Sequence, residues 1–434
     1  MQFVIPLLIF TRKFLSKMKK SRLLLTFVSI IILISGCCTS RVQRYNAKVY
    51  IPVYKDLKEV RNEFRNESPR DLENPGKIYV YGSYLFINEF KKGIHIINNS
   101  NPSEPKFVNF INIPGNGDIA VKGDILYADS YIDLLAIDIS NPYNAKLVKR
   151  IEDIFPNPLT TDQSYLDPEK GLLVDFIIRD TVYEYIYEDC WDSYSSPVME
   201  NDGRKSSGGT QGPGTPLGIG CSMARFTIYQ NYLYAVDHSD LQTFDISTPS
   251  NPLVWAKVNV GNEIETIFPF KDKLFIGSTT GMFIYDNSVP WNPRQIAQFS
   301  HARGCDPVVA NDTLAFVTLR TGTRCASNQN QLDILDIKDI FKPKLIATYP
   351  MQEPAGLGID KNVLFICDGK AGLKVFDFTK PKEIKLLSWI SDLNTYDVIP
   401  IGTYAIIIGI DGLYQYNYND PEKLILLSKI SIKK

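Results

Sequence analysis

The sequence predicts an all-β protein, a β-propeller of seven four-stranded blades. Two observations carry this prediction: a unit of about 40 residues recurs along the chain, and its copies alternate apolar and polar residues with the period of a strand. A third observation agrees, because aromatic residues make up 12% of the chain and such side chains fill pleated, half-buried sheets well.

Each copy is marked by an anchor residue, an acidic or amide side chain that ends the third strand. The anchor residues are Asn98, Asp138, Asp245, Asp286, Asp336, Asp377 and Asn417. Their successive intervals are 40, 107, 41, 50, 41 and 40 residues, so four of the six agree within one residue. Such a side chain accepts backbone N–H bonds in the turn that follows. In six copies a proline stands four residues later, where it interrupts the ladder before the last strand.

Residues that tolerate tight turns stand at the first hairpin of each copy: Gly82, Gly123, Asn231, Asp272, Asp312, Asn362 and Gly402. One short sheet cannot bury both of its faces, whereas radial stacking of sheets buries them and leaves only short edges. The 107-residue interval leaves room for a degenerate eighth blade as an alternative. We expect seven blades over residues 77–434, with an insertion at about 158–223.

The run Ile-Asp-Ile-Ser-Asn-Pro at residues 137–142, with its counterparts in the other copies, resembles the LVIVD-repeat family of bacterial β-propeller proteins. The resemblance extends over residues 77–432 apart from the insertion. It implies a propeller in a cell-envelope setting and does not imply a reaction.

Residues 1–36 have the form of a lipoprotein signal peptide. Four basic residues between positions 17 and 22 precede residues 23–34, which are apolar except for two hydroxyl side chains. This run is shorter than the roughly 20 residues that a membrane-spanning helix needs. It leads into Ser35-Gly36-Cys37, which resembles the bacterial lipobox, so we expect Cys37 to be lipidated and to anchor the chain through acyl groups. An ordinary secretory signal with an incidental cysteine is the alternative, and the start is Met1 or Met18.

The mature chain is mildly acidic. Loss of residues 1–36 removes six basic residues and no acidic one, which leaves 47 − 6 = 41 basic against 48 acidic side chains. This charge gives no electrostatic reason to bind nucleic acid. No aspartate follows Cys37 directly, and we therefore expect an exported protein on the outer membrane, facing either the periplasm or the exterior.

Two segments lie outside the repeats. Residues 37–76 predict an N-terminal tether, with a strand over 49–54 and a short helix within 56–67. In the insertion, residues 172–187 predict a two-stranded ribbon that turns at Arg179-Asp180, and residues 201–220 predict a polar, glycine-rich loop.

An exported chain can form disulfides. Cys305 and Cys325 flank the first hairpin of the fifth blade and should meet at one end of it. Cys190 and Cys221 flank the glycine-rich loop and either pair or stay free, whereas Cys367 lies in a strand and predicts a buried thiol. No cysteine has the spacing of a zinc site.

One end of the central channel is the candidate binding face. The first position of the inner strand is expected at Lys77, Asp118, Arg225, Thr266, Asp306, Gly356 and Asp397. These charges either hold a polar ligand or a cation such as calcium, or pair with one another and cap strand ends. Asp129, Asp237 and Asp368 recur at the ends of second strands, which suggests a structural role. On the same face, His301 lies near Cys305, and Trp191 lies in the insertion.

Two classes of function follow from these patterns. The first is a binding or assembly module at the cell envelope, which docks an unknown protein or glycan on its loop-rich face. The alternative is a propeller enzyme, a hydrolase or lyase, with a polar or metal site where Asp118, Asp306 and Asp397 converge. The chain has no GxSxG elbow, phosphate-binding loop or HExxH helix, so the sequence assigns no catalytic residue and no cofactor.

Overall fold

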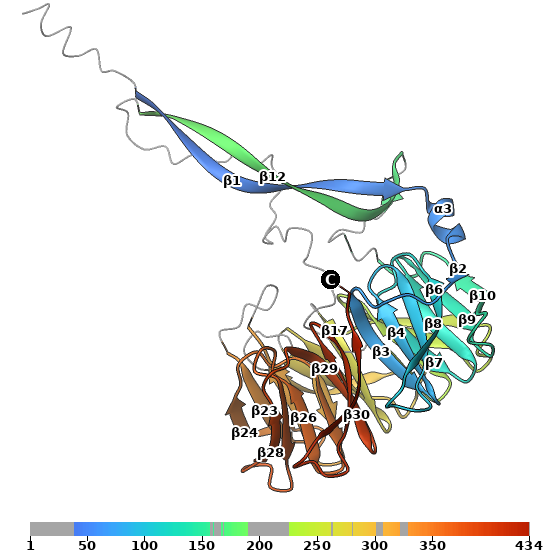
Figure 1. Ribbon diagram of the computed structural model, residues 1–434, viewed down its shortest axis with the longest axis vertical. Coiled ribbons are helices and arrows are strands. Elements are labelled where there is room, and N and C mark those ends of the chain that lie inside the picture. The colour runs from blue at the N-terminus through green and yellow to red at the C-terminus, as the bar shows by residue number, and fades with distance from the viewer. Residues whose placement is uncertain are drawn as a thin grey trace, which may run out of the picture. The chain divides into compact units, whose positions relative to one another are not determined.

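The computed structural model describes residues 39–156, 159, 166–167, 169–189, 225–261, 264–279, 281–300, 307–321 and 329–433. Their elements fall into two compact units, one with most of the long strands β1 and β12 and one with the seven sheets. The seven sheets form a β-propeller, which confirms the predicted fold class and the count of seven blades (Figure 1). Within the described ranges, no helix is long and apolar enough to cross a membrane.

Each blade is an antiparallel sheet of four strands that follow one another in the chain. Blade one has β3 (Pro75–Tyr81), β4 (Tyr84–Glu89), β5 (Gly93–Asn98) and β6 (Lys106–Asn112). Blade two has β7 (Ile119–Lys122), β8 (Ile125–Ser130), β9 (Asp133–Asp138) and β10 (Lys146–Ile151). Blade three has β13 (Phe226–Tyr229), β14 (Tyr232–Val236), β15 (Asp240–Asp245) and β16 (Leu253–Asn259).

The other four blades follow without a long interruption. Blade four has β17 (Ile264–Phe270), β18 (Lys273–Ser278), β19 (Gly281–Asp286) and β20 (Arg294–Ser300). Blade five has β21 (Val308–Ala310), β22 (Leu314–Leu319), β23 (Gln331–Asp336) and β24 (Lys344–Pro350). Blade six has β25 (Leu357–Asp360), β26 (Val363–Cys367), β27 (Leu373–Asp377) and β28 (Lys385–Ile390). Blade seven has β29 (Thr395–Ile401), β30 (Tyr404–Gly409), β31 (Gly412–Asn417) and β32 (Ile425–Ser431).

The anchor residues act as predicted in all seven blades. Each side chain accepts the N–H of the residue two positions later, at 2.7–3.2 Å. The N–H of the intervening residue donates to a carbonyl in the first turn of the same blade, at 2.7–3.1 Å. The first and third turns therefore lie together at one end of each blade, which we call the turn face. The opposite end, where blades are linked and second strands lead into third strands, is the loop face.

The core lies between the blades. Seven clusters of buried apolar side chains each join two neighbouring blades, including one cluster between blades seven and one. Each outer strand also carries an irregularity in its pairing with the third strand, at the same place in every blade. Such bulges sharpen the twist of the outer strand and interrupt its edge.

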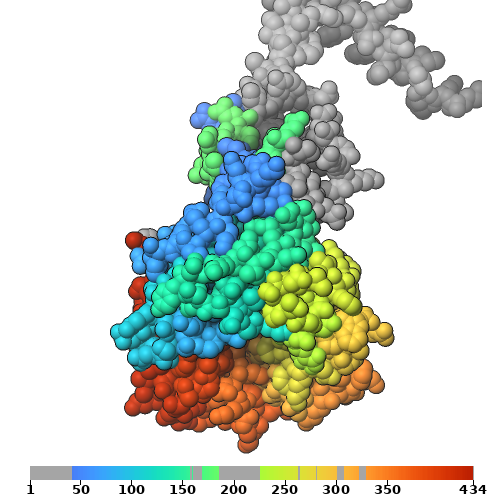
Figure 2. All heavy atoms as spheres, turned by 90° about the vertical axis from the view of Figure 1, so that its right-hand side faces the viewer, coloured from blue at the N-terminus to red at the C-terminus, as the bar shows by residue number. Residues whose placement is uncertain are grey.

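The ring is closed by contacts between blades one and seven, and no blade shares a strand across the closure. Leu72 forms a parallel bridge with Ile432, and the N–H of Lys433 donates to the Leu72 carbonyl at 2.7 Å. The side-chain amides of Asn99 and Gln415 exchange two hydrogen bonds of 2.9 and 2.8 Å. In the space-filling view the blue and cyan surface of blade one borders the red surface of blade seven (Figure 2).

The segments outside the repeats correct two expectations. The predicted strand at residues 49–54 is part of the much longer β1 (Thr39–Lys55). Residues 172–187 do not turn at Arg179-Asp180, because they lie in one continuous strand, β12 (Gly171–Asp189), whose partners are β1 and the short β11 (Leu166–Asp167). Alternation alone predicted a strand period but could not identify the partner strand.

The predicted helix is present and shorter than expected, as α3 (Leu57–Asn62). Asp56 caps it by accepting the N–H groups of Lys58 and Glu59 at 2.8 and 3.2 Å, which satisfies donors that a helix start leaves unpaired. The chain then forms β2 (Arg65–Glu67), which adds a fifth strand to blade one beside β6.

Candidate functional site

The register of the innermost strands places the channel positions. In each blade one residue of the inner strand pairs with the fourth residue of the second strand. The residue just before it is Lys77, Asp118, Arg225, Thr266, Pro307, Gly356 or Asp397. Pro307, rather than the predicted Asp306, takes this position in blade five, because Val308 pairs with Val317, the fourth residue of β22. The other six predicted residues share this register position, although none of them is the first residue of its inner strand.

Asp118 is the centre of this face on blades one to three. Its carboxylate lies 2.7 Å from the Lys77 ammonium of blade one. It also accepts the N–H groups of Arg225 and Phe226 of blade three, at 2.5 and 3.2 Å. The Lys77 ammonium in turn donates to the Phe226 carbonyl at 3.0 Å. Asp118 thus joins three blades and holds the point where the chain returns from the insertion.

Asp129 organises the chain just before Asp118. Its buried carboxylate accepts the N–H groups of Gly117 and Asp118, at 2.6 and 2.9 Å, and the side-chain amide of Asn116 at 2.9 Å. The Arg225 guanidinium lies 3.3 Å from the same carboxylate. Burial raises the pKa of Asp129, and the charge of Arg225 and the N–H donors oppose that rise.

Burial also acts on the lysine of this cluster. It lowers the pKa of Lys77, while the neighbouring Asp118 carboxylate opposes the shift. The Lys77 side chain is 15% exposed and that of Asp118 is 3% exposed, so this ion pair is largely withdrawn from water. The cluster consequently has the form of a paired, desolvated structural network.

Asp397 acts on this network through its charge, which opposes the lowering of the pKa of Lys77 by burial. Its carboxylate accepts the N–H of the next residue, Val398, at 2.9 Å. A Cβ atom on Gly356 would lie 2.1 Å from the same carboxylate, so only glycine leaves room for Asp397 there. In the part of the chain that the structure describes, no group of three or more His, Cys, Asp or Glu side chains could hold a metal ion.

The acids at the ends of the second strands share one function in three blades. Glu89, Asp129 and Asp368 each accept two consecutive N–H groups from the segment that leads into the inner strand of their own blade. Asp237 instead accepts the N–H groups of Ser239 and Asp240, at 2.9 and 2.8 Å. The prediction that the repeated aspartates are structural fits these contacts.

The remaining predicted residues either are buried or lie outside the described part of the chain. Cys367 is a buried free thiol, as predicted. His95 is fully buried, lies 3.0 Å from the Glu89 carboxylate and packs edge-on against Phe107 and Phe110. The following lie outside the described residues: Cys37, Cys190, Trp191, Cys221, His301, Cys305, Asp306 and Cys325.

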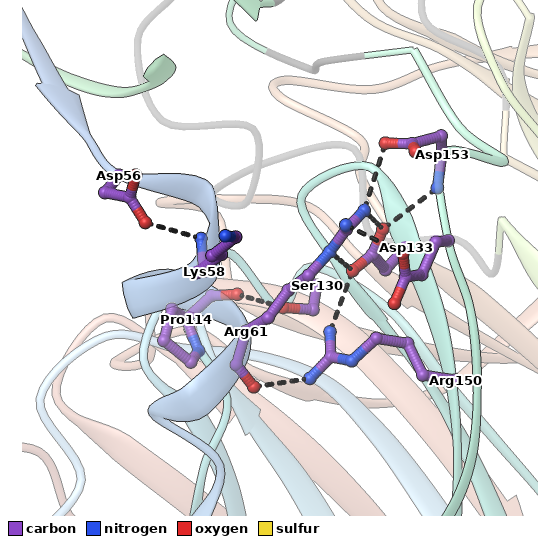
Figure 3. Close-up of polar contacts among 9 residues, drawn as sticks. Asp56, Lys58, Arg61, Pro114, Ser130, Asp133, Arg150 and Asp153 are labelled. Atoms are coloured by element: carbon purple, nitrogen blue, oxygen red, sulfur yellow. Dashed lines mark hydrogen bonds and ion pairs between the residues drawn. The ribbon is translucent and has the colours of Figure 1, made fainter. Parts of the chain in front are cut away.

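A second polar cluster, which the sequence did not reveal, lies on the loop face of blade two (Figure 3). The guanidinium of Arg61 in α3 binds both carboxylate oxygens of the buried Asp133, each at 2.8 Å. Arg150 donates to the same carboxylate at 2.9 Å and to the Arg61 carbonyl at 2.9 Å. These contacts hold α3 on blade two. No local sequence pattern could predict this cluster, because Asp133 is 72 positions from Arg61 and 17 positions from Arg150.

Exposed aromatic side chains are a further feature that sequence reasoning did not single out. Tyr143, Trp291 and Phe341 occupy equivalent positions in the third turns of blades two, four and five, and they are 65%, 48% and 65% exposed. Trp255 and Trp389 lie on outer strands, and each is 52% exposed. The three aromatic turn residues could have been found from the sequence, because each stands five positions after an anchor residue.

Comparisons with known proteins agree with this architecture. A search of curated proteins found no match. A computationally designed protein named Ika8 is similar to this chain at 8% identity, over 82% of this chain and 87% of the designed one, with a TM-score of 0.51. A protein from Lactobacillus plantarum is similar at 12% identity, over 85% of this chain and 97% of that one, with a TM-score of 0.51. At these identities the likeness concerns the fold alone. The model of the LVIVD repeat matches residues 75–112, 116–153 and 223–260, so blades one, two and three each carry an LVIVD repeat.

Proposed function

We propose that this chain is an exported, lipid-anchored binding module of the cell envelope, which docks a protein or glycan partner on its loop face. The charge pairing at the channel carries the proposal. Asp118, one of the three acids expected at a catalytic or metal site, and the neighbouring Asp129 are bound to Lys77, to Arg225 and to main-chain N–H groups. A carboxylate engaged in this way is a poor general base and a poor ligand.

The loop face supports the proposal for a second reason. The insertion leaves the propeller after β10 and returns before β13, and these two strand ends lie on the loop face. The loop between β22 and β23 also leaves and returns there. Long connections on a rigid scaffold are a common place for recognition. The sequence of Cys37 and its preceding apolar run supports an anchor, with the outer membrane as the proposed location.

Crosslinking in cells tests the partner. The full-length lipidated chain should capture a discrete product. The double variant Trp191→Ala/Tyr194→Ala, which removes two aromatic side chains of the insertion, should lose it. The matched control is Trp255→Ala/Trp291→Ala, which removes exposed aromatic side chains away from the loop face and should keep the product. Point variants are preferable to removal of residues 158–223, since that deletion takes away β12, the partner of β1.

Two outcomes would overturn the proposal. Equal capture by both double variants would show that the insertion does not bind the partner. A rise in melting temperature with calcium, zinc or manganese, together with loss of that rise in Asp397→Asn, would instead favour the enzyme alternative with a metal in the channel.

A further inference from the structure

The described buried side chains of the β1 and β12 ribbon lie at one end of it, at Leu172, Leu173 and Val174. Over residues 42–51 and 176–184, where the side chains are described, no residue is buried. Six large apolar or aromatic side chains are 45–57% exposed there: Val42, Tyr45, Ile177, Ile178, Val182 and Tyr183. Because an isolated two-stranded ribbon is marginally stable in water, we expect part of this surface to be covered in the cell.

Four of these residues lie toward one end of the ribbon and on both of its faces, because successive side chains of a strand point to opposite faces. The Arg44 guanidinium lies 2.8 Å from the Glu184 carboxylate, which brings that part of β1 beside that part of β12. Val42 and Tyr45 lie within two positions of Arg44, and Val182 and Tyr183 lie within two positions of Glu184. We call these four residues the ribbon tip. The start of β1 and the end of β12 lie together beyond them (Figure 1).

The tip is also the part of the ribbon nearest to the proposed anchor. β1 begins at Thr39, two residues after Cys37. An extended chain spans at most about 3.6 Å per residue, so Val42 can lie no farther than about 18 Å from Cys37, and Tyr45 no farther than about 29 Å. Once Cys37 holds the chain to the membrane, lipid is present at high effective concentration beside the tip.

The chemistry of the tip suits the headgroup layer of a membrane. Tyrosine combines an apolar ring with a polar hydroxyl and is enriched at membrane interfaces. The end of the ribbon, residues 39–46 and 182–189, holds two basic and three acidic side chains, so it carries little net charge toward the headgroups. Among the described residues β12 is the one partner strand of β1, so the other edge of β1 would expose main-chain groups to hydrocarbon, which excludes the ribbon from the hydrocarbon interior.

We propose that the ribbon tip contacts the lipid headgroup layer and is a second membrane contact beside the acyl anchor. This inference rests on the proposed anchoring at Cys37. Two weak contacts give a more stable attachment than one. The more distant Ile177 and Ile178, twelve and eleven positions from the end of β12, remain outside this contact and serve as controls.

Tryptophan quenching tests the contact in the lipidated protein. Three proteins are compared on the same vesicles: the parent chain, Tyr45→Trp and Ile177→Trp. The vesicles contain four parts phosphatidylcholine to one part phosphatidylglycerol, with brominated acyl chains. After subtraction of the parent's four tryptophans, the Tyr45→Trp emission should be quenched at least twofold more than that of Ile177→Trp. Unlipidated Cys37→Ala chain should bind the same vesicles weakly, and Tyr45→Ser/Tyr183→Ser should reduce that binding further.

The outcomes separate this inference from the anchor. If the chain floats with the vesicles and the two reporters are quenched equally, the tip contact is wrong and the anchor stands. If the emission wavelength of Tyr45→Trp shifts with protein concentration and the emission is not quenched by the lipid, a second copy of the chain covers the tip instead. If the unmodified chain does not float with vesicles, both the anchor and the tip contact are wrong.

Discussion

Asp118 shows how a single carboxylate can join three blades. It accepts two main-chain N–H groups of blade three and pairs with the largely buried Lys77 of blade one. Removal of one partner of a buried ion pair leaves the other charge uncompensated, which typically costs about 3–5 kcal/mol.

We therefore expect Asp118→Asn to lower the free energy of unfolding by about 3 kcal/mol, as measured by urea denaturation. The double variant Lys77→Met/Asp118→Asn should recover more than half of this loss, because it leaves no unpaired charge. A double variant less stable than Asp118→Asn would show that Lys77 contributes chiefly through its bond to the Phe226 carbonyl.

The first turns of the blades carry a measurable backbone cost. Gly82, Gly123 and Gly402 have φ of 57°, 55° and 63°, while Gln230, Lys271 and Lys361 adopt φ of 52°, 51° and 53° at equivalent positions. The left-handed conformation costs a residue other than glycine roughly 1–2 kcal/mol. The sequence predicted these turns but pointed to Asn231, Asp272 and Asn362, each one residue after the residue with positive φ.

Lys361→Gly should accordingly stabilise the fold by up to about 1 kcal/mol, after the added freedom of the unfolded chain is subtracted. Gly402→Lys should destabilise it by about 1 kcal/mol, since no atom lies within 4 Å of the position of an added Cβ and only backbone strain remains. Thermal melting of the two variants checks this pair, and shifts of the same sign would contradict it.

At the scale of the elements, the anchor turns make the blades sensitive to acid. Hydrogen bonds from the Ser140, Ser247 and Thr379 hydroxyls and N–H groups lower the pKa of Asp138, Asp245 and Asp377, respectively. The unfolded chain then binds more protons than the folded chain near pH 4. The stabilisation is present above the unfolded pKa of about 3.9 and is lost as the pH falls through the lower folded value.

Asparagine keeps the turn without the titration, as Asn98 and Asn417 do in blades one and seven. The triple variant Asp138→Asn/Asp245→Asn/Asp377→Asn should therefore lose less stability than the parent between pH 5 and about pH 2.5. Urea unfolding at a series of pH values measures this slope. An unchanged acid slope would mean that other carboxylates govern acid unfolding.

The elements also show what local patterns can predict. The four strands of each blade follow from alternation and turn residues, which are local, and the α3 cap at Asp56 is local too. The pairing of β1 with β12 joins segments more than a hundred residues apart, and neither strand carries a signal for its partner. The same distance hid the Arg61–Asp133 contact, although both residues are ordinary surface types by sequence.

Asp133 holds α3 on blade two and can be tested by itself. Its carboxylate is buried and binds Arg61, Arg150 and the N–H of Asp153. Asp133→Asn should weaken this docking by about 3 kcal/mol, which corresponds to amide exchange in α3 on the order of 100-fold faster. Glu152→Gln is the matched control, because Glu152 also pairs with Arg61 but is 56% exposed and should contribute under about 1 kcal/mol. Similar exchange in both variants would show that α3 is held by its apolar contacts.

At the scale of the whole molecule, the seams between blades follow a rule that the sequence only partly showed. At six seams a side chain of one blade donates to the carbonyl of the proline in the third turn of the next blade. In the described residues no such bond joins blades four and five, where Ile340 stands in the place of the proline. The six prolines are visible in the sequence, but their donors are of several types, including Tyr127, Ser388 and Ser428, and could not be predicted.

Ring closure is the last whole-molecule property that can be tested. The closing seam joins the two ends of the chain and relies on the mutual amide pair of Asn99 and Gln415, both buried. Gln415→Ala removes both bonds of this pair and leaves the Asn99 amide only its 3.2 Å bond to the Tyr404 hydroxyl, so it should lower the free energy of unfolding by about 2 kcal/mol. Ser388→Ala, which removes one hydrogen bond at the seam between blades six and seven, should cost about 1 kcal/mol.

Because each blade is stabilised by both of its neighbours, opening the closing seam exposes blades one and seven together. Hydrogen exchange in Gln415→Ala should accordingly accelerate in both of these blades before it does so in blade four. Acceleration confined to blade seven would show that the contacts of Leu72 with Ile432 and Lys433 close the ring without the amide pair.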